Sequence, residues 1–413
     1  MALYDTDEII EKVILVSVAF DSSDETESSL DELSELAKTA GAVTVGRMIQ
    51  TRENFHPGTY IGKGKIEELR VMIDELDATG IICDDELSPA QFKNLEDELQ
   101  VKVMDRTMVI LDIFAARATS SEGKIQVEMA QLKYRSIRLA GFGASMSRLG
   151  GGIGTRGPGE KKIETDRRLI KDRISKLSSD LKDMKENREI QREKRSKSST
   201  PVAAIVGYTN AGKSTLLNKL TDAGVLSEDK LFATLDPTTR AMELPNGEKI
   251  LLTDTVGFIR KLPHNLIEAF KSTLEEAKYA DIIVHVVDVS NPDYEQQMST
   301  VYATLKQLGV EGKPVVTLFN KCDILPEMPS AKDLHADYIY NISAYRGMGL
   351  DAFKMCLQDI ILKSRIRIER LFQYNEAGKI QLIREYGQLE SEEYTENGIK
   401  VIAYVPKQIE GKL

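Results

Sequence analysis

Residues 207–214 read G-Y-T-N-A-G-K-S, and these residue types suit the binding of a polyphosphate. Two glycines allow a tight turn that directs backbone N–H groups at phosphate oxygens. Lys213 can place a cation on the β- and γ-phosphate oxygens, and the Ser214 hydroxyl can bind Mg²⁺. The pattern therefore predicts a site for a nucleoside triphosphate. Its residues are Gly207, Tyr208, Thr209, Asn210, Ala211, Gly212, Lys213, Ser214 and Thr215.

A second motif, further along the chain, indicates which base is bound. Asp323 ends the sequence N-K-C-D, and its carboxylate can accept hydrogen bonds from guanine N1–H and from the guanine 2-amino group. Adenine offers neither donor, so an acceptor left unpaired discriminates against it. A following S-A-Y loop can read guanine O6 through a backbone N–H. The predicted guanine-binding residues are Asn320, Lys321, Cys322, Asp323, Ser343, Ala344 and Tyr345.

Two segments between these motifs suit the sensing of a γ-phosphate. In D-T-V-G, Asp254 can hold the Mg²⁺ shell through water and the Gly257 N–H can bind the γ-phosphate. In F-A-T-L-D, Thr234 is the candidate metal ligand beside Ser214, and Thr238 and Thr239 are alternative ligands. Alternatively, these threonines bind no metal and only favour a turn. The nucleotide-binding residues predicted here are Phe232, Ala233, Thr234, Leu235, Asp236, Asp254, Thr255, Val256 and Gly257, and the catalytic candidates are Lys213, Thr234 and Gly257.

The residue after Gly257 is Phe258. GTPases that hydrolyse quickly on their own have a glutamine at this position, which orients the attacking water. An apolar side chain cannot hold that water. We therefore expect slow hydrolysis by the protein alone and a catalytic group supplied from elsewhere.

The elements that must position these motifs follow from apolar patterning. The run at residues 201–206 predicts a buried strand directly before the phosphate loop, and residues 213–220 have the spacing of a helix. Runs at 250–253 and 313–319 predict strands that lead into D-T-V-G and N-K-C-D. We therefore expect an α/β multidomain protein whose P-loop GTPase domain, residues 197–364, is a mixed sheet flanked by helices.

The first 118 residues alternate strand and helix patterns, which predicts an N-terminal α/β domain at 1–118. The strands are expected at 12–20, 42–48, 80–83 and 101–104, and the helices at 29–39, 65–76 and 89–99. Lys63 and Lys65, in G-K-G-K, resemble part of an anion-binding loop, because glycines at a helix start expose N–H groups beside the two lysines. An ordinary strand-to-helix turn is the alternative reading of this motif.

Residues 119–196 are expected to form an antiparallel helical hairpin. Apolar residues between 163 and 184 recur at helical spacing, and residues 124–139 are the expected partner. Between them, the glycine-rich stretch 141–159 contains Arg148 and Arg156, which we predict to contact RNA from a loop at the tip. A simple flexible linker is the alternative. Residues 186–200 are polar and predict a linker into the GTPase domain.

Composition restricts the class of protein. The net charge is −10, yet residues 131–200 hold 19 Lys or Arg against 9 Asp or Glu, a net of +10 that suits contact with phosphates or a solvated helical face. Three cysteines, Cys83, Cys322 and Cys356, share no metal or disulfide spacing and are expected to be buried. This cysteine pattern suits a reducing cytosol, and the sequence has neither an N-terminal apolar segment nor a run of 18 apolar residues, so we expect no signal peptide or spanning helix. We expect a cytoplasmic protein and a monomer; peripheral attachment to membranes is left open. Residues 365–413 predict a small C-terminal α+β domain.

Taken together, the motifs resemble the translation-factor-like P-loop GTPases, and the flanking sequence resembles the HflX family. The segments that carry this second resemblance are G-T-Y-I-G-K-G-K at 58–65, the run 105–114, Q-V-E-M-A-Q-L at 126–132 and G-G-I-G-T-R-G-P-G-E at 151–160. With the GTPase motifs they cover about residues 10 to 365. The tail resembles the C-terminal extension of bacterial members.

The resemblance implies a function and its partners. Members bind GTP or GDP with Mg²⁺, associate with the large (50S) ribosomal subunit and its RNA, and split stalled or stress-inactivated 70S ribosomes into subunits. The resemblance also implies that the N-terminal domain helps to bind ribosomal RNA, for which Lys63 and Lys65 are candidates, and that some members bind a second nucleotide there. Asn210 lies where potassium-stimulated relatives have an asparagine, which implies a K⁺ ion near it. A large-subunit assembly or maturation chaperone that uses GTP as a state label is the alternative, and a regulatory scaffold is a third.

Overall fold

The computed structural model describes residues 10–20, 24–146, 158–196, 200–221, 231–232, 236–261, 275–328, 330–411 and 413. The predicted ligands Ala233, Thr234 and Leu235 and the arginines Arg148 and Arg156 lie outside these residues. The chain forms two compact units. One comprises Met1–Asp183, Glu228–Asp236 and Phe258–Thr273, and the other Met184–Ser227, Pro237–Gly257 and Leu274–Leu413.

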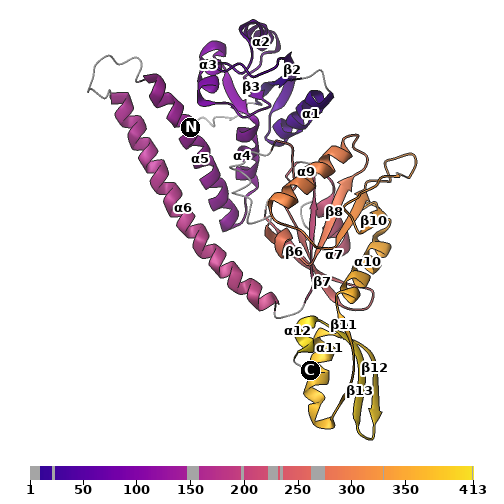
Figure 1. Ribbon diagram of the computed structural model, residues 1–413. Helices are drawn as coiled ribbons and strands as arrows, with labels where there is room; N and C mark the ends of the chain where they lie inside the picture. The colour runs from indigo at the N-terminus through magenta and orange to yellow at the C-terminus, as the bar shows by residue number, and fades with distance from the viewer. Residues whose placement is uncertain are drawn as a thin grey trace, which may run out of the picture. The chain divides into compact units, whose positions relative to one another are not determined.

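The first unit contains a four-stranded parallel sheet in the order β2-β1-β3-β4 (Figure 1). Its strands are β1 (Lys12–Ala19), β2 (Val43–Thr51), β3 (Gly80–Cys83) and β4 (Lys102–Asp105), and its helices are α1 (Asp24–Thr39), α2 (Lys63–Leu76), α3 (Pro89–Leu99) and α4 (Arg106–Arg117). Aliphatic side chains of β1 and β3, Ile14 and Ile81 among them, form the core with Leu69 of α2 and Leu95 of α3. The expected α/β architecture is confirmed. Helix α4, which apolar spacing did not suggest, begins directly at the end of β4 with Asp105 as its N-cap.

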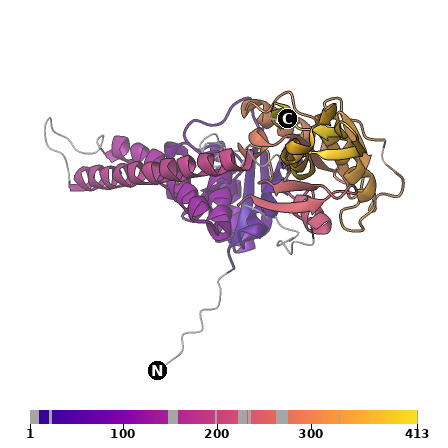
Figure 2. The same cartoon turned by 90° about the horizontal axis from the view of Figure 1, so that it is seen from below.

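Two long helices follow, α5 (Ser121–Met146) and α6 (Pro158–Ser196). They lie side by side in Figures 1 and 2, and Arg173 of α6 forms an ion pair with Glu128 of α5 at 2.7 Å. Both helices are longer than expected: α5 continues through Gly141 and Gly143, and α6 begins at Pro158. Glycine in a helix costs only about 1 kcal/mol relative to alanine, which flanking turns can offset. The linker predicted at 186–200 was wrong up to Ser196, since α6 includes this polar stretch.

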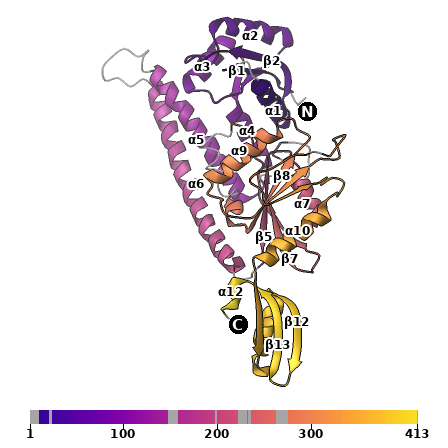
Figure 3. The same ribbon diagram turned by 45° about the vertical axis from the view of Figure 1, so that its right-hand side comes forward.

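The second unit contains a six-stranded mixed sheet in the order β10-β9-β8-β5-β7-β6, in which only β6 runs antiparallel to its neighbour. Strands β5, β7 and β8 of this sheet are labelled in Figure 3. The strands are β5 (Val202–Gly207), β6 (Thr238–Glu243), β7 (Lys249–Asp254), β8 (Ile282–Asp288), β9 (Val315–Asn320) and β10 (Tyr338–Asn341). Its described helices include α7 (Lys213–Thr221), α9 (Tyr294–Gln307) and α10 (Leu350–Lys363). Leu216 and Leu217 of α7 and Phe353 of α10 are buried against the sheet core. The expected mixed sheet flanked by helices is confirmed.

The C-terminal part of the second unit is a three-stranded antiparallel sheet in the order β11-β13-β12. It consists of β11 (Ile366–Phe372), a 3₁₀ turn (Tyr374–Glu376), α11 (Ala377–Tyr386), β12 (Gln388–Thr395), β13 (Gly398–Val405) and α12 (Lys407–Glu410). Ile380 and Ile383 of α11 pack with Val401 and Ala403 of β13. Within the described residues, no helix is long and apolar enough to cross a membrane.

Candidate guanine-nucleotide site

The predicted motifs of the second unit follow the ends of parallel strands. The phosphate loop comes after β5, Asp254 ends β7, Asn320 ends β9, and the loop with Ser343 follows β10. Parallel strands place their carboxyl ends at one edge of a sheet, which is where open α/β sheets bind ligands. The register confirms the proximity at this edge, since Ile205 pairs with Asp254 and Asp288 with Asn320. The fold therefore gathers the separate motifs at one edge.

The phosphate loop has the backbone geometry that its glycines suggest. Gly207 and Gly212 have φ values of +154° and +96°, and Asn210 also lies in the left-handed region at +60°. A Cβ on Gly207 would lie 2.2 Å from the Val286 carbonyl oxygen, and one on Gly212 would lie 2.3 Å from the Asn320 side-chain nitrogen. Larger residues at either glycine would therefore displace the loop or its neighbours.

Lys213, at the start of α7, is buried, and its ammonium group donates to the Tyr208 carbonyl oxygen at 2.7 Å. Burial lowers the pKa of Lys213 to about 8, although the Asp254 carboxylate acts in the opposite direction. A cation held in a desolvated position needs an anionic partner. Phosphate oxygens are therefore a fitting ligand for this group.

Two of the residues predicted to hold Mg²⁺ lie together in the structure. The Ser214 hydroxyl donates to the fully buried Asp254 carboxylate at 2.7 Å. Hard oxygen donors and one carboxylate suit Mg²⁺, which keeps several of its waters and takes further oxygens from phosphates. Of the alternatives to Thr234, Thr238 pairs with Asp254 in the strand register, whereas the Thr239 hydroxyl is bonded to that of Thr253 at 2.9 Å. No cluster of His, Cys, Asp and Glu suited to another metal occurs among the described residues.

Gly257 lies directly against the phosphate loop. A Cβ at this position would come 2.8 Å from Thr209 Cα and 3.0 Å from Lys213 Nζ. The backbone of the D-T-V-G segment therefore lies beside the lysine that is expected to hold the β- and γ-phosphates. Thr255, within the same motif, fixes its start by donating its hydroxyl to the Ile205 carbonyl oxygen at 2.8 Å.

Asn320 joins the guanine motif to the phosphate loop. Its side-chain amide donates to the Ala211 carbonyl oxygen at 2.8 Å, and its side-chain oxygen accepts from the Ala344 N–H at 2.9 Å. One buried side chain thus holds three separate loops in register. Lys321, in the left-handed region at φ +65°, forms an ion pair with Asp288 at 2.8 Å. Cys322 is buried, as are Cys83 and Cys356, so the expectation for the three cysteines is confirmed.

The carboxylate of Asp323, which we predict to read the base, has a partner that the sequence did not indicate. Arg346 donates to Asp323 at 3.1 Å. A hydrogen bond from Ser343, followed by the charge of Arg346, holds the pKa of Asp323 below its usual range. Asp323 is therefore ionised at neutral pH, as an acceptor for two guanine donors must be. Tyr345, also predicted at this loop, is largely exposed.

Two residues predicted to bind nucleotide belong instead to the first unit. Phe232 is buried and packs edge-on against Phe114 of α4 with ring centroids 4.6 Å apart. The Asp236 carboxylate accepts from the N–H groups of Thr119 and Ser120 at 3.0 and 2.8 Å. Although burial raises it, these bonds hold the pKa of Asp236 below its usual value.

The predicted RNA-contact lysines of the first unit also have defined positions. Lys63 is exposed at the first residue of α2, and Lys65 is paired with Glu68 in the same helix. The other two candidates, Arg148 and Arg156, lie outside the described residues.

Comparison with known proteins gives matches along most of the chain. Residues 27–115 match a family described as the N-terminal region of GTP-binding GTPases, and residues 117–195 match its middle region. Residues 202–321 match the family described as 50S ribosome-binding GTPase.

Individual relatives match over nearly the same span. A GTPase HflX from Lacrimispora saccharolytica is 63% identical over 98% of this chain and 96% of its own. The GTPase HflX of Escherichia coli is 39% identical over 84% of this chain and 82% of its own. A solved GTP-binding protein of Sulfolobus solfataricus in complex with GDP is 26% identical, with a TM-score of 0.45, over 85% of this chain and 99% of that one.

Proposed function

This chain belongs to the HflX family of GTPases, and we propose that it is a Mg²⁺-dependent GTPase. We propose further that it binds the large ribosomal subunit and splits stalled or stress-inactivated 70S ribosomes. The observation that carries the nucleotide assignment is the Asn320 side chain, which bonds both the phosphate loop and the loop after β10. A ligand that contacts both loops requires their relative positions to be fixed. Bound guanine nucleotide would be such a ligand, with its phosphates at Lys213 and its base at Asp323.

The residues of this chain have separate tasks in hydrolysis. Lys213 binds the β- and γ-phosphate oxygens, and the Gly257 N–H contacts the γ-phosphate, so both stabilise charge that develops during transfer. Ser214 and, through water, Asp254 would hold Mg²⁺, which would supply further positive charge to the phosphates. Phe258 is buried and apolar, so no side chain at that position orients water. Hydrolysis is therefore slow until a partner supplies the missing group.

Two observations support the ribosome as that partner. The 50S ribosome-binding model matches the nucleotide-binding region, and the segment 131–200 has a net charge of +10 on an otherwise acidic chain. Basic side chains on an acidic protein direct binding to RNA phosphates and make it salt-dependent. The helical hairpin α5–α6, which contains most of this segment, is therefore the proposed contact with ribosomal RNA.

Steady-state GTP turnover with and without purified large subunits tests the proposal. We expect slow turnover by the protein alone, a large increase with large subunits, and loss of both when Mg²⁺ is chelated. Small subunits provide the control. Fast turnover that large subunits leave unchanged would contradict the role given to Phe258 and to the ribosome.

A further inference from the structure

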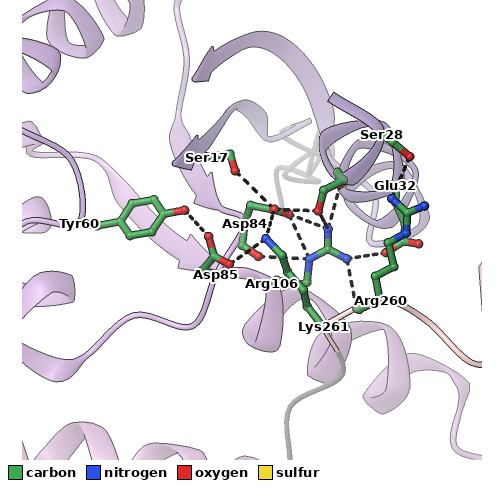
Figure 4. Close-up of polar contacts among 10 residues, drawn as sticks. Ser17, Ser28, Glu32, Tyr60, Asp84, Asp85, Arg106, Arg260 and Lys261 are labelled. Carbon is green, nitrogen blue, oxygen red and sulfur yellow. Dashed lines mark hydrogen bonds and ion pairs between the residues drawn. The ribbon is translucent and has the colours of Figure 1, made fainter. Parts of the chain in front are cut away.

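The first unit contains a buried carboxylate with an unusual number of partners. Asp84 follows β3 and is fully buried. Its carboxylate accepts from Arg106 at 2.6 and 3.1 Å and from the Ser29 hydroxyl at 2.8 Å (Figure 4). Arg106, itself buried, is also paired with Glu32 at 2.5 Å. Arg106 has one positive charge against these two carboxylates, and a second cation lies beside them.

That cation is Lys261. Its ammonium group lies 2.6 Å from Asp84 and 2.7 Å from Asp85, between the two carboxylates (Figure 4). Asp85 also accepts from the Tyr60 hydroxyl at 2.6 Å. The preceding residue, Arg260, donates to the Ser28 hydroxyl at 2.9 Å. Consecutive side chains of one segment are thus bonded to the loop after β3 and to α1 of the first unit.

The backbone at Lys261 is held in an unfavourable conformation. Its φ is +51°, in the left-handed region that costs a residue with a Cβ roughly 1 kcal/mol or more. Such a conformation persists where surrounding contacts impose it. The paired carboxylates, with the buried side chains of Phe258 and Ile259, provide those contacts.

Lys261, which we call the anchor, lies close in the sequence to the nucleotide-binding motif D-T-V-G. Lys261 lies four residues after Gly257, the proposed γ-phosphate sensor. Gly257 lies against Thr209 and Lys213 of the phosphate loop. Four residues later, the chain is held at Lys261 by Asp84 and Asp85, which limits the conformations open to the residues that follow Gly257. A binding group that is ordered beforehand loses less conformational entropy when its ligand arrives.

We propose that Lys261, held by Asp84 and Asp85, is a positioning residue that orders the D-T-V-G segment for the γ-phosphate. The inference rests on the proposed function, because it assumes that Gly257 contacts the γ-phosphate of bound GTP. GDP lacks that phosphate. Loss of the anchor therefore weakens binding of a non-hydrolysable GTP analogue and leaves GDP binding unchanged.

Lys261→Met removes the charge and keeps a side chain of similar length. We expect it to lower the affinity for the GTP analogue, relative to that for GDP, by roughly fivefold, as for a partly exposed but multiply bonded ion pair. Lys261→Arg retains the charge and should restore most of the ratio. Lys12→Met is the matched control, since Lys12 pairs with Asp77 at 2.9 Å in the same unit with similar exposure. It should leave the ratio unchanged.

Asp85→Asn, alone and combined with Lys261→Met, tests the pairing itself. The two single effects on the affinity ratio should not add, because both remove the same contact. An equal loss of GDP and analogue affinity, an unchanged ratio, or a higher analogue affinity in Lys261→Met would each overturn the positioning role. If the wild-type protein bound neither nucleotide, the proposed function itself would fail, a result distinct from these.

Discussion

Lys213 combines full burial with a positive charge, and its titration is therefore linked to stability and to ligand binding. In the folded protein its pKa is about 8, against an unperturbed value of 10.5. Because the folded pKa is depressed, the unfolded chain binds more protons between about pH 8 and 10.5. Burial of the charged Lys213 therefore lowers the free energy of unfolding by its full amount below pH 8. This loss of stability disappears as pH rises from about 8 to 10.5.

Nucleotide binding should reverse this shift, because phosphate oxygens favour the charged ammonium. We predict that GDP binding takes up a substantial fraction of a proton at pH 8.5 and almost none at pH 6.5. Titration calorimetry in buffers of different ionisation enthalpy measures the uptake. Equal uptake at both pH values would show that Lys213 does not titrate in this range.

Asp323 gives a second test at the same scale. Asp323→Asn replaces one acceptor of the carboxylate with an amide donor and removes the charge that Arg346 contacts. GTP binding should weaken by orders of magnitude, and the preference should move toward xanthosine triphosphate, whose C2 carbonyl accepts from an amide. Competition binding with GTP, ATP and xanthosine triphosphate measures it. An unchanged preference for guanine would remove Asp323 from the base site.

Among the elements, the phosphate loop and the loop after β9 depend on each other through Asn320. Gly212→Ala places a Cβ 2.3 Å from the Asn320 amide and should separate these loops. We expect GDP affinity to fall at least tenfold. This is more than the backbone strain of an alanine in the left-handed region, about 1 kcal/mol, would cause by itself. Gly309→Ala is the control, since Gly309 has φ +70° with no atom within 4 Å of a Cβ. Similar GDP affinities in the two variants would contradict the coupling.

The elements also show what the sequence could and could not predict. The strands of the N-terminal sheet have local apolar patterns, so the sequence predicts their ends to within three residues. Strand β12 (QLESEEYT) is polar and half-exposed, with no periodicity to reveal it. Lys261 is paired with Asp84 and Asp85, which lie 177 and 176 positions earlier in the sequence. Neither segment has a motif that indicates the other.

For the whole molecule, the uneven distribution of charge leads to a prediction about salt. The segment 131–200 has a net charge of +10, and the remainder has −20. Binding to large subunits should therefore weaken steeply as salt rises, because each neutralised phosphate releases counterions. Substituting Arg148 and Arg156 together should flatten that dependence, measured by co-sedimentation over a KCl series. Substituting Arg367 and Arg384 of the C-terminal sheet domain provides the control, and an equal flattening there would contradict a specific role for the segment.

Asn210 has a consequence for the choice of monovalent salt. Its left-handed backbone places it, exposed, at the phosphate loop, where its carboxamide oxygen can help to hold K⁺. Hydrolysis should be faster in KCl than in NaCl at equal ionic strength, and Asn210→Ala should remove the difference. Equal rates for the wild-type protein would leave Asn210 as a residue that only shapes the loop.

Density-gradient analysis of 70S ribosomes mixed with the protein and a non-hydrolysable GTP analogue measures whether the GTP-bound protein separates ribosomes. We expect the 70S peak to decrease while the 50S and 30S peaks grow, with the protein on the 50S fraction and no effect in GDP. A 70S peak that stays intact while the protein binds only free 50S particles would contradict splitting and support a role in large-subunit maturation.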